Sequence, residues 1–185
     1  MSSYLRYTRL VTLMKDEFRI PIEEKSQHLL ALIHTNKAIV LRSRGDVSGA
    51  VKLYDKALDI RERQVFKEGK NDFAHFLAVI YMNKAMAEER LGDACKALIL
   101  TDKAISIWKS LRLNGNDQSL YFLSRVLSNK ALLVERLGNS IIAVSLLEQS
   151  IDNYRHLINK EGRNDLMTEF ATLEHHLKRL RCNLP

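Results

Sequence analysis

Apolar side chains recur every three or four residues along most of this chain, which is the period of an amphipathic helix. One such run covers residues 72–91 and is interrupted at Gly92-Asp93. A second run with the same period follows at residues 94–112. Because a glycine readily ends a helix and turns the chain, this segment predicts two antiparallel helices joined by a tight turn.

The same two-helix unit occurs three times. The tripeptide Asn-Lys-Ala begins at Asn36, Asn83 and Asn129, so that successive copies are 47 and 46 residues apart. Each tripeptide precedes a Gly-Asp or Gly-Asn pair that keeps the same spacing. Markers with one shared period indicate an array of helical repeats, in which each unit buries its apolar face against its neighbours.

The pattern predicts three helix pairs and one further helix at each end. The pairs are residues 24–43 with 47–67, 72–91 with 94–112, and 118–137 with 140–160. In the repeat register, residues 4–18 match the second helix of a pair and residues 165–181 match a first helix. We expect a single domain, divided into an end helix 1–21, repeats 22–69, 70–115 and 116–162, and an end helix 163–185.

Particular residues should set the ends of these helices. Pro21 is expected to end the first segment, because proline cannot continue a helix. Asp72 and Asp117 each follow a glycine marker and are expected to be N-caps. In the last helix Lys178 takes the place of the recurring alanine, which suits a terminal helix that is exposed to water.

The composition supports a globular protein. The 185 residues are 46% hydrophobic and 28% charged, and the two cysteines are too few for a disulfide framework. No apolar run approaches the roughly 20 residues of a membrane span, and we expect a cytoplasmic protein without membrane contact. The net charge of +7 leaves nucleic acid or an acidic partner open, although the basic residues are scattered among 22 acidic ones.

The repeat resembles the tetratricopeptide repeat family over about residues 4–181. The shared features are a small residue in the first helix and a glycine at the turn, here Ala38, Ala85 and Ala131 with Gly45, Gly92 and Gly138. Because its repeats are longer than the usual unit of about 34 residues, the chain is similar to long-repeat bacterial members and loosely to kinesin light chains. The resemblance implies an all-α, right-handed solenoid whose first helices line a concave groove.

No pattern of an enzyme or a cofactor site is found in the sequence. It contains no phosphate-binding glycine loop, no zinc-protease motif and no nucleophile elbow, so we expect neither catalysis nor a cofactor. His175, His176 and Cys182 lie close together in the sequence, but a solvated end helix explains them better than a metal site.

The expected groove combines an apolar floor with a few polar groups, which suits a peptide or a partner helix. Its asparagines could pair with a ligand backbone or could bridge adjacent helices, and the sequence leaves both interpretations open. The expected ligand-facing residues are Asn36, Asn83, Asn129, Ile39, Met82, Met86, Leu132, Arg90, Arg136, Arg125, His75 and Tyr121.

We therefore predict a protein-interaction scaffold or adaptor that binds a peptide or helix in the groove. Binding of nucleic acid or an acidic partner through the basic surface is one alternative. Self-association into a homo-oligomer through exposed apolar surface is another.

Overall fold

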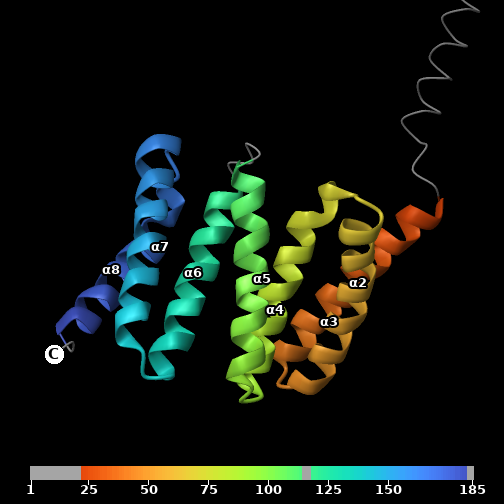
Figure 1. The fold of residues 1–185 in the computed structure, drawn as a ribbon, viewed down its shortest axis with the longest axis horizontal. Coiled ribbons are helices and arrows are strands. Elements are labelled where there is room, and N and C mark those ends of the chain that lie inside the picture. Colours follow the sequence, from red (N-terminus) through yellow and green to blue (C-terminus); the bar gives the residue numbers. More distant parts are fainter. Residues whose placement is uncertain (1–21, 114–117, 183–185) are drawn as a thin grey trace, which may run out of the picture.

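A computed structural model describes residues 22–113 and 118–182 of the chain. Within them the α-helices stand side by side in one row, from α2 at one end to α8 at the other (Figure 1). They are α2 (Ile22–Ser43), α3 (Val47–Glu62), α4 (Ala74–Arg90), α5 (Ala94–Leu113), α6 (Gln118–Arg136), α7 (Ser140–Glu161) and α8 (Met167–Cys182). The described part of the chain is therefore an all-α solenoid, as predicted.

The predicted helix pairs are confirmed, with small differences at their ends. A π-helical turn, Arg63–Lys67, continues α3, and 3₁₀ turns at Asn71–Phe73 and Asn164–Leu166 lead into α4 and α8. The first helices of the repeats are α2, α4 and α6, the second helices are α3, α5 and α7, and α8 is a first helix without a following partner. The helix expected at 4–18 and the stop at Pro21 lie outside the described residues.

The prediction that Asp72 caps a helix is wrong. Asp72 lies inside the 3₁₀ turn, where the Phe73 N–H donates to the Lys70 carbonyl and no side chain caps the first turn. The 3₁₀ bonds satisfy backbone groups that a cap would otherwise bind. Asp117, the other expected cap, lies outside the described residues.

Side-chain caps occur instead at the start of the second helices. Asp46 accepts a hydrogen bond from the Gly49 N–H, and Asn139 accepts one from Ile142. The glycine before Asp46 has a φ of +91°, a left-handed conformation that costs glycine little. The Gly-Asp and Gly-Asn pairs thus end one helix and begin the next within a few residues.

Small residues allow the helices of a pair to approach closely. Ala38, Ala85 and Ala131 are all buried in the continuous core that runs through the three repeats. In the third pair the Ser150 hydroxyl donates to the Ser124 carbonyl at 2.8 Å, which joins α7 directly to α6. Lys178 lies 47 residues after Ala131 and is exposed on α8, so the last helix does have a solvated face as expected.

Candidate functional site

The first helices α4, α6 and α8 form a groove with two hollows. One hollow of about 260 Å³ lies between α4 and α6, and another of about 560 Å³ lies between α6 and α8. Asn129 lines both of them. We call these the α4/α6 hollow and the α6/α8 hollow, and Asn129 marks the point where they meet.

The α4/α6 hollow has an apolar floor and a charged rim. Met86 and Leu132 contribute the apolar surface, and Arg90 and Arg136 lie beside them. Arg136 forms an ion pair with Glu89 across the two helices. Of the residues expected to be exposed here, Met82 is instead a core residue with only 5% of its surface exposed. Met82 lies on the side of α4 that faces α5 and α6, where it borders a small enclosed space together with Ala97 and Val126.

The asparagine ladder is not used uniformly. The Asn83 amide donates to the Val79 carbonyl at 3.1 Å and accepts from Arg42 at 3.5 Å, and its residue is only 8% exposed. Asn129 makes no side-chain hydrogen bond to another described residue and is half-buried at the junction of the two hollows. The structure thus gives Asn83 a partner within the protein and leaves the amide of Asn129 open to a ligand.

The first repeat contributes little to either hollow. Asn36 and Ile39 are exposed on α2, and neither lines the α4/α6 or the α6/α8 hollow. The Arg42 guanidinium reaches from the same helix to α4, where it contacts the Met86 sulfur at 3.7 Å. The part of the groove with defined hollows therefore begins at α4.

Polar groups of the α6/α8 hollow come from three helices. Arg125 and Asn129 belong to α6, Glu169 belongs to α8, and Tyr154 comes from α7 behind them. Tyr154 is only 2% exposed, and its hydroxyl has no hydrogen-bond partner among the described residues. Burial, and to a smaller extent the nearby Tyr121 and Glu169, raise the pKa of Tyr154 to about 12, although Arg125 opposes this shift. Tyr154 is therefore a neutral hydroxyl at physiological pH.

Tyr154 and Glu169 were not among the residues expected from the sequence. Tyr154 lies on a second helix, whereas the expected groove residues were taken from first helices alone. Glu169 lies on α8, which was interpreted as a capping helix. The repeat alignment does point to Tyr154, because the same position of the first two repeats also holds a large side chain with a polar group, Arg61 and Trp108.

His75 and Tyr121, both expected to face a ligand, pack among aromatic rings. The His75 ring lies 4.5 Å from Phe122 and accepts a hydrogen bond from the Trp108 indole N–H at 3.4 Å. Burial lowers the pKa of His75. The Tyr121 ring lies between two guanidinium groups, those of Arg125 and Arg163, at 5.6 and 5.5 Å.

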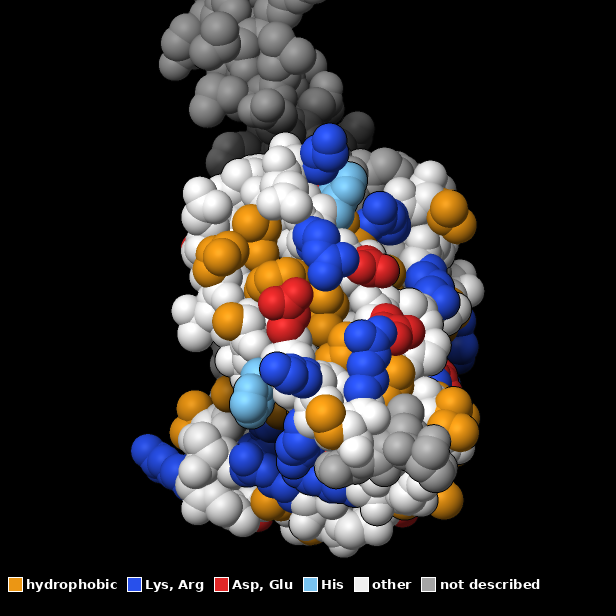
Figure 2. All heavy atoms as spheres, turned by 90° about the vertical axis from the view of Figure 1, so that its left-hand side faces the viewer, with side chains coloured by type: hydrophobic (Ala, Val, Ile, Leu, Met, Phe, Trp, Pro, Cys, Tyr) orange, Lys and Arg blue, Asp and Glu red, His pale blue; other side chains and the backbone are white. Residues whose placement is uncertain are grey.

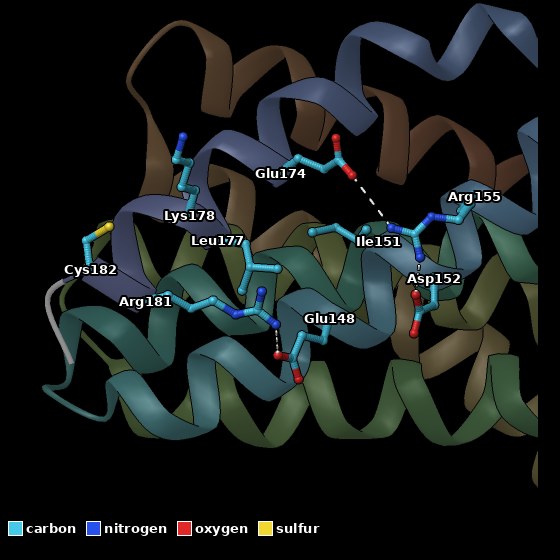
Figure 3. A pocket seen from close by; sticks show the side chains of 9 residues that line it. All are labelled: Glu148, Ile151, Asp152, Arg155, Glu174, Leu177, Lys178, Arg181 and Cys182. Carbon is cyan, nitrogen blue, oxygen red and sulfur yellow. Dashed lines mark hydrogen bonds and ion pairs between the residues drawn. The ribbon is translucent and has the colours of Figure 1, made fainter. Parts of the chain in front are cut away.

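A third hollow, of about 690 Å³, lies between α7 and α8 (Figure 3). Five of its charged side chains point toward one another: Arg181 bonds to Glu148 at 2.5 Å, and Arg155 lies between Asp152 and Glu174 at 2.6 and 3.6 Å. Although this hollow is larger than the other two, these five ion-pairing residues already satisfy one another.

The end of the solenoid that carries α8 is a mixed surface. Figure 2 views the molecule from this end and shows Lys and Arg side chains among Asp, Glu, His and apolar ones. Glu135 forms an ion pair with Arg179 and a hydrogen bond with His176, both at 2.7 Å, and these contacts join α6 to α8 at this end. These contacts fix α8 against α6 and thereby fix the wall of the α6/α8 hollow.

Within residues 22–113 and 118–182, no three or more His, Cys, Asp or Glu side chains come together as a metal ion would require. None of the helices in these ranges is both long and apolar enough to cross a bilayer.

Comparison with known proteins finds a family model that matches one helix pair of the chain. Residues 31–63 match the model of the tetratricopeptide repeat. The match covers part of α2 and all of α3, and it shows that this helix pair is similar to tetratricopeptide repeats, which generally mediate protein–protein interaction. A search of curated proteins gave no significant match.

Among solved structures, the chain is similar to BtubC (BKLC) from P. vanneervenii, with a TM-score of 0.56 and 21% identity. The alignment covers 85% of this chain and 65% of BtubC, so the chain spans less than two thirds of that protein. This similarity supports the fold alone. The designed helical repeat protein DHR64 (TM-score 0.38, 16% identity, 94% and 92% covered) and the DHF58 filament (0.36, 18%, 97% and 97%) are more distant.

Proposed function

We propose that the chain is a protein-interaction module that binds an extended segment of a partner in the groove of α4, α6 and α8. The observation that carries this proposal is Asn129, whose unpaired amide lies where two hollows meet. A primary amide offers a donor and an acceptor, so it can pair with a peptide backbone whatever the partner's side chains are. The apolar floor at Met86 and Leu132 would add contact area beside it.

Two lysines of the recurring Asn-Lys-Ala tripeptide fit this proposal better than they fit a surface that binds nucleic acid. Lys84 pairs with Asp55, and Lys130 pairs with Asp102 at 2.5 Å, each joining a first helix to the preceding second helix. A lysine that is neutralised within the protein contributes little to phosphate binding.

The test compares two apolar residues that are both exposed, one in the groove and one outside it. Leu132→Glu places a charge on the floor, whereas Ile99→Glu places the same charge on the outward side of α5. Each variant and the parent are immobilised, and proteins captured from a lysate of the native cell are identified by mass spectrometry. We expect Ile99→Glu to retain the partners of the parent and Leu132→Glu to lose them. Equal capture by both variants would rule out the groove.

Self-association is a second candidate, and one surface favours it. Ile33 of α2 is 60% exposed, although the residues at its position in the next two repeats, Ile80 and Val126, are buried in the core. Leu29, Leu30 and Val40 are also exposed on α2. Residues 1–21, which precede this face, lie outside the described part of the chain. Light scattering over a range of concentrations measures whether the chain associates. Comparison with Ile33→Lys then tests whether the association uses this exposed face of α2.

A further inference from the structure

The α6/α8 hollow differs from its neighbours because its polar groups lack partners. The Arg125 guanidinium lies over the Tyr121 ring, and neither Arg125 nor Glu169 forms an ion pair with a described residue. The Tyr154 hydroxyl and the Asn129 amide are likewise without hydrogen-bond partners in the described ranges. In the α7/α8 hollow, by contrast, Arg155 and Arg181 are both paired with carboxylates.

The remaining carboxylate near the hollow is already neutralised. Asp165 accepts two hydrogen bonds from the Arg163 guanidinium, at 2.9 and 2.8 Å. The charges left for a ligand are therefore one cation on the α6 wall, Arg125, and one anion on the α8 wall, Glu169. Behind them the Tyr154 side chain, more than nine-tenths buried, adds a neutral hydroxyl that can donate or accept.

Opposite charges on facing walls select for a particular kind of ligand group. A lysine or arginine side chain would be attracted by Glu169 but repelled by Arg125, and an aspartate or glutamate would meet the reverse. A neutral amide can satisfy both walls, because its carbonyl oxygen accepts from a guanidinium while its N–H donates to a carboxylate. An amide also loses less hydration free energy than a charged side chain when it enters the hollow.

We propose that the α6/α8 hollow binds the side-chain amide of a glutamine or asparagine in the partner segment. The amide carbonyl lies toward Arg125 and Tyr154, and the amide N–H groups lie toward Glu169. Asn129, at the edge of the same hollow, pairs with the backbone that carries this side chain. The inference rests on the proposed groove function, to which it adds a preference for one class of residue.

The experiment selects binders from a random linear peptide library displayed on phage, with the full-length chain as bait. Parallel selections use Glu169→Gln, Arg125→Gln and a matched control, Glu174→Gln. The control removes a carboxylate from the same helix as Glu169, but on the side that lines the α7/α8 hollow. Circular dichroism of each bait confirms that it is folded.

The parent and the control should select peptides with glutamine or asparagine at one fixed position. Glu169→Gln leaves Arg125 unopposed and should change this position to aspartate or glutamate. Arg125→Gln should change it to lysine or arginine. Replacing the selected amide residue by leucine in a parent-selected peptide should weaken binding roughly tenfold to a hundredfold, since hydrogen bonds to charged groups are the stronger ones.

Three results would overturn the proposal, and they differ in whether the proposed groove function fails with it. If the parent selects peptides whose binding requires Leu132 but shows no preference for an amide, this inference fails while the groove function stands. If the parent selects no peptides at all, both fail. A preference for an amide that neither Glu169→Gln nor Arg125→Gln alters would also contradict the assignment to this hollow.

Discussion

In the second repeat, the Trp108 indole donates to His75, and the Asn83 amide donates to its own helix and accepts from Arg42. In the third repeat, the equivalent positions hold Tyr154 and Asn129, and neither polar group has a hydrogen-bond partner in the described chain. The two repeats are built on one backbone plan, with the same buried alanines and the same glycine turn. They differ in whether the polar groups at these positions of the first and second helices are bound within the protein.

This difference suggests that equivalent polar groups contribute to stability in one repeat and to ligand binding in another. A polar group with an internal partner contributes to stability, and a ligand can use it only by breaking that bond. A polar group that lines a hollow without a partner is hydrated in the free protein and available for binding. Under the proposed function, Asn83 therefore supports the structure, whereas Asn129 and Tyr154, together with α8, are available to a ligand.

The largest expected effect concerns where the repeat core ends. Replacing the fully buried Ala131 by lysine would give the third repeat the side chain that α8 carries at Lys178. An unpaired charge in the core should lower the free energy of unfolding by about 3–5 kcal/mol. Lys178→Ala, on the exposed face of α8, should change it by less than about 0.5 kcal/mol. Urea denaturation measures both, and equal effects would mean that α8 is as buried as α6.

A smaller effect should distinguish the two aromatic positions. Trp108→Phe removes the hydrogen bond to His75 and some buried volume, and should cost about 1–3 kcal/mol. Tyr154→Phe removes a hydroxyl that has no internal partner, so the free energy of unfolding should remain within about 0.5 kcal/mol of the parent. Denaturation midpoints at matched slopes provide the comparison. A large loss for Tyr154→Phe would show that its hydroxyl is already bound within the protein.

The pH dependence of stability should also differ between the repeats. Burial lowers the pKa of His75 in the folded protein, so near neutral pH and below the unfolded chain binds more protons there. The free energy of unfolding should therefore fall as the pH decreases below about 6.5, until the folded-state pKa is passed. Burial and Arg61 lower the pKa of His28 in the same direction.

The matched variant is His75→Tyr, which installs the residue that Tyr121 provides in the third repeat. It should reduce the slope of stability against pH below about 6.5, and His175→Tyr, on the exposed face of α8, is the control for the substitution itself. Thermal unfolding at a series of pH values gives the slopes. An unchanged slope in His75→Tyr would place the titrating group elsewhere.

Much of this fold could be predicted because the same residue types recur at the same positions of each repeat. The glycine turns, the buried alanines and the exposed Lys178 all followed from aligning the units. The Asp72 cap did not, because a 3₁₀ turn and a side-chain cap satisfy the same backbone groups, and the sequence pattern does not distinguish them.

The candidate site was less predictable because its contacts differ from one repeat to the next. Alignment of repeats assigns one role to Asn36, Asn83 and Asn129, but the role depends on neighbours that do not repeat. Arg42 binds Asn83, and the corresponding residue of the second repeat, Glu89, pairs with Arg136 and leaves Asn129 open. Such contacts join residues more than 40 positions apart, and only the packed structure brings them together.

The most direct test of this account compares Asn83→Ala with Asn129→Ala in one peptide-binding assay. Calorimetry with a peptide selected on the parent should show affinity reduced about two- to twelvefold by Asn129→Ala and little changed by Asn83→Ala. Urea denaturation should show the reverse, with a loss of about 0.5–1 kcal/mol for Asn83→Ala alone, since alanine's higher helix propensity offsets part of the lost bond. If Asn83→Ala weakens binding as much as Asn129→Ala and neither alters stability, the two repeats share one role and the account is contradicted.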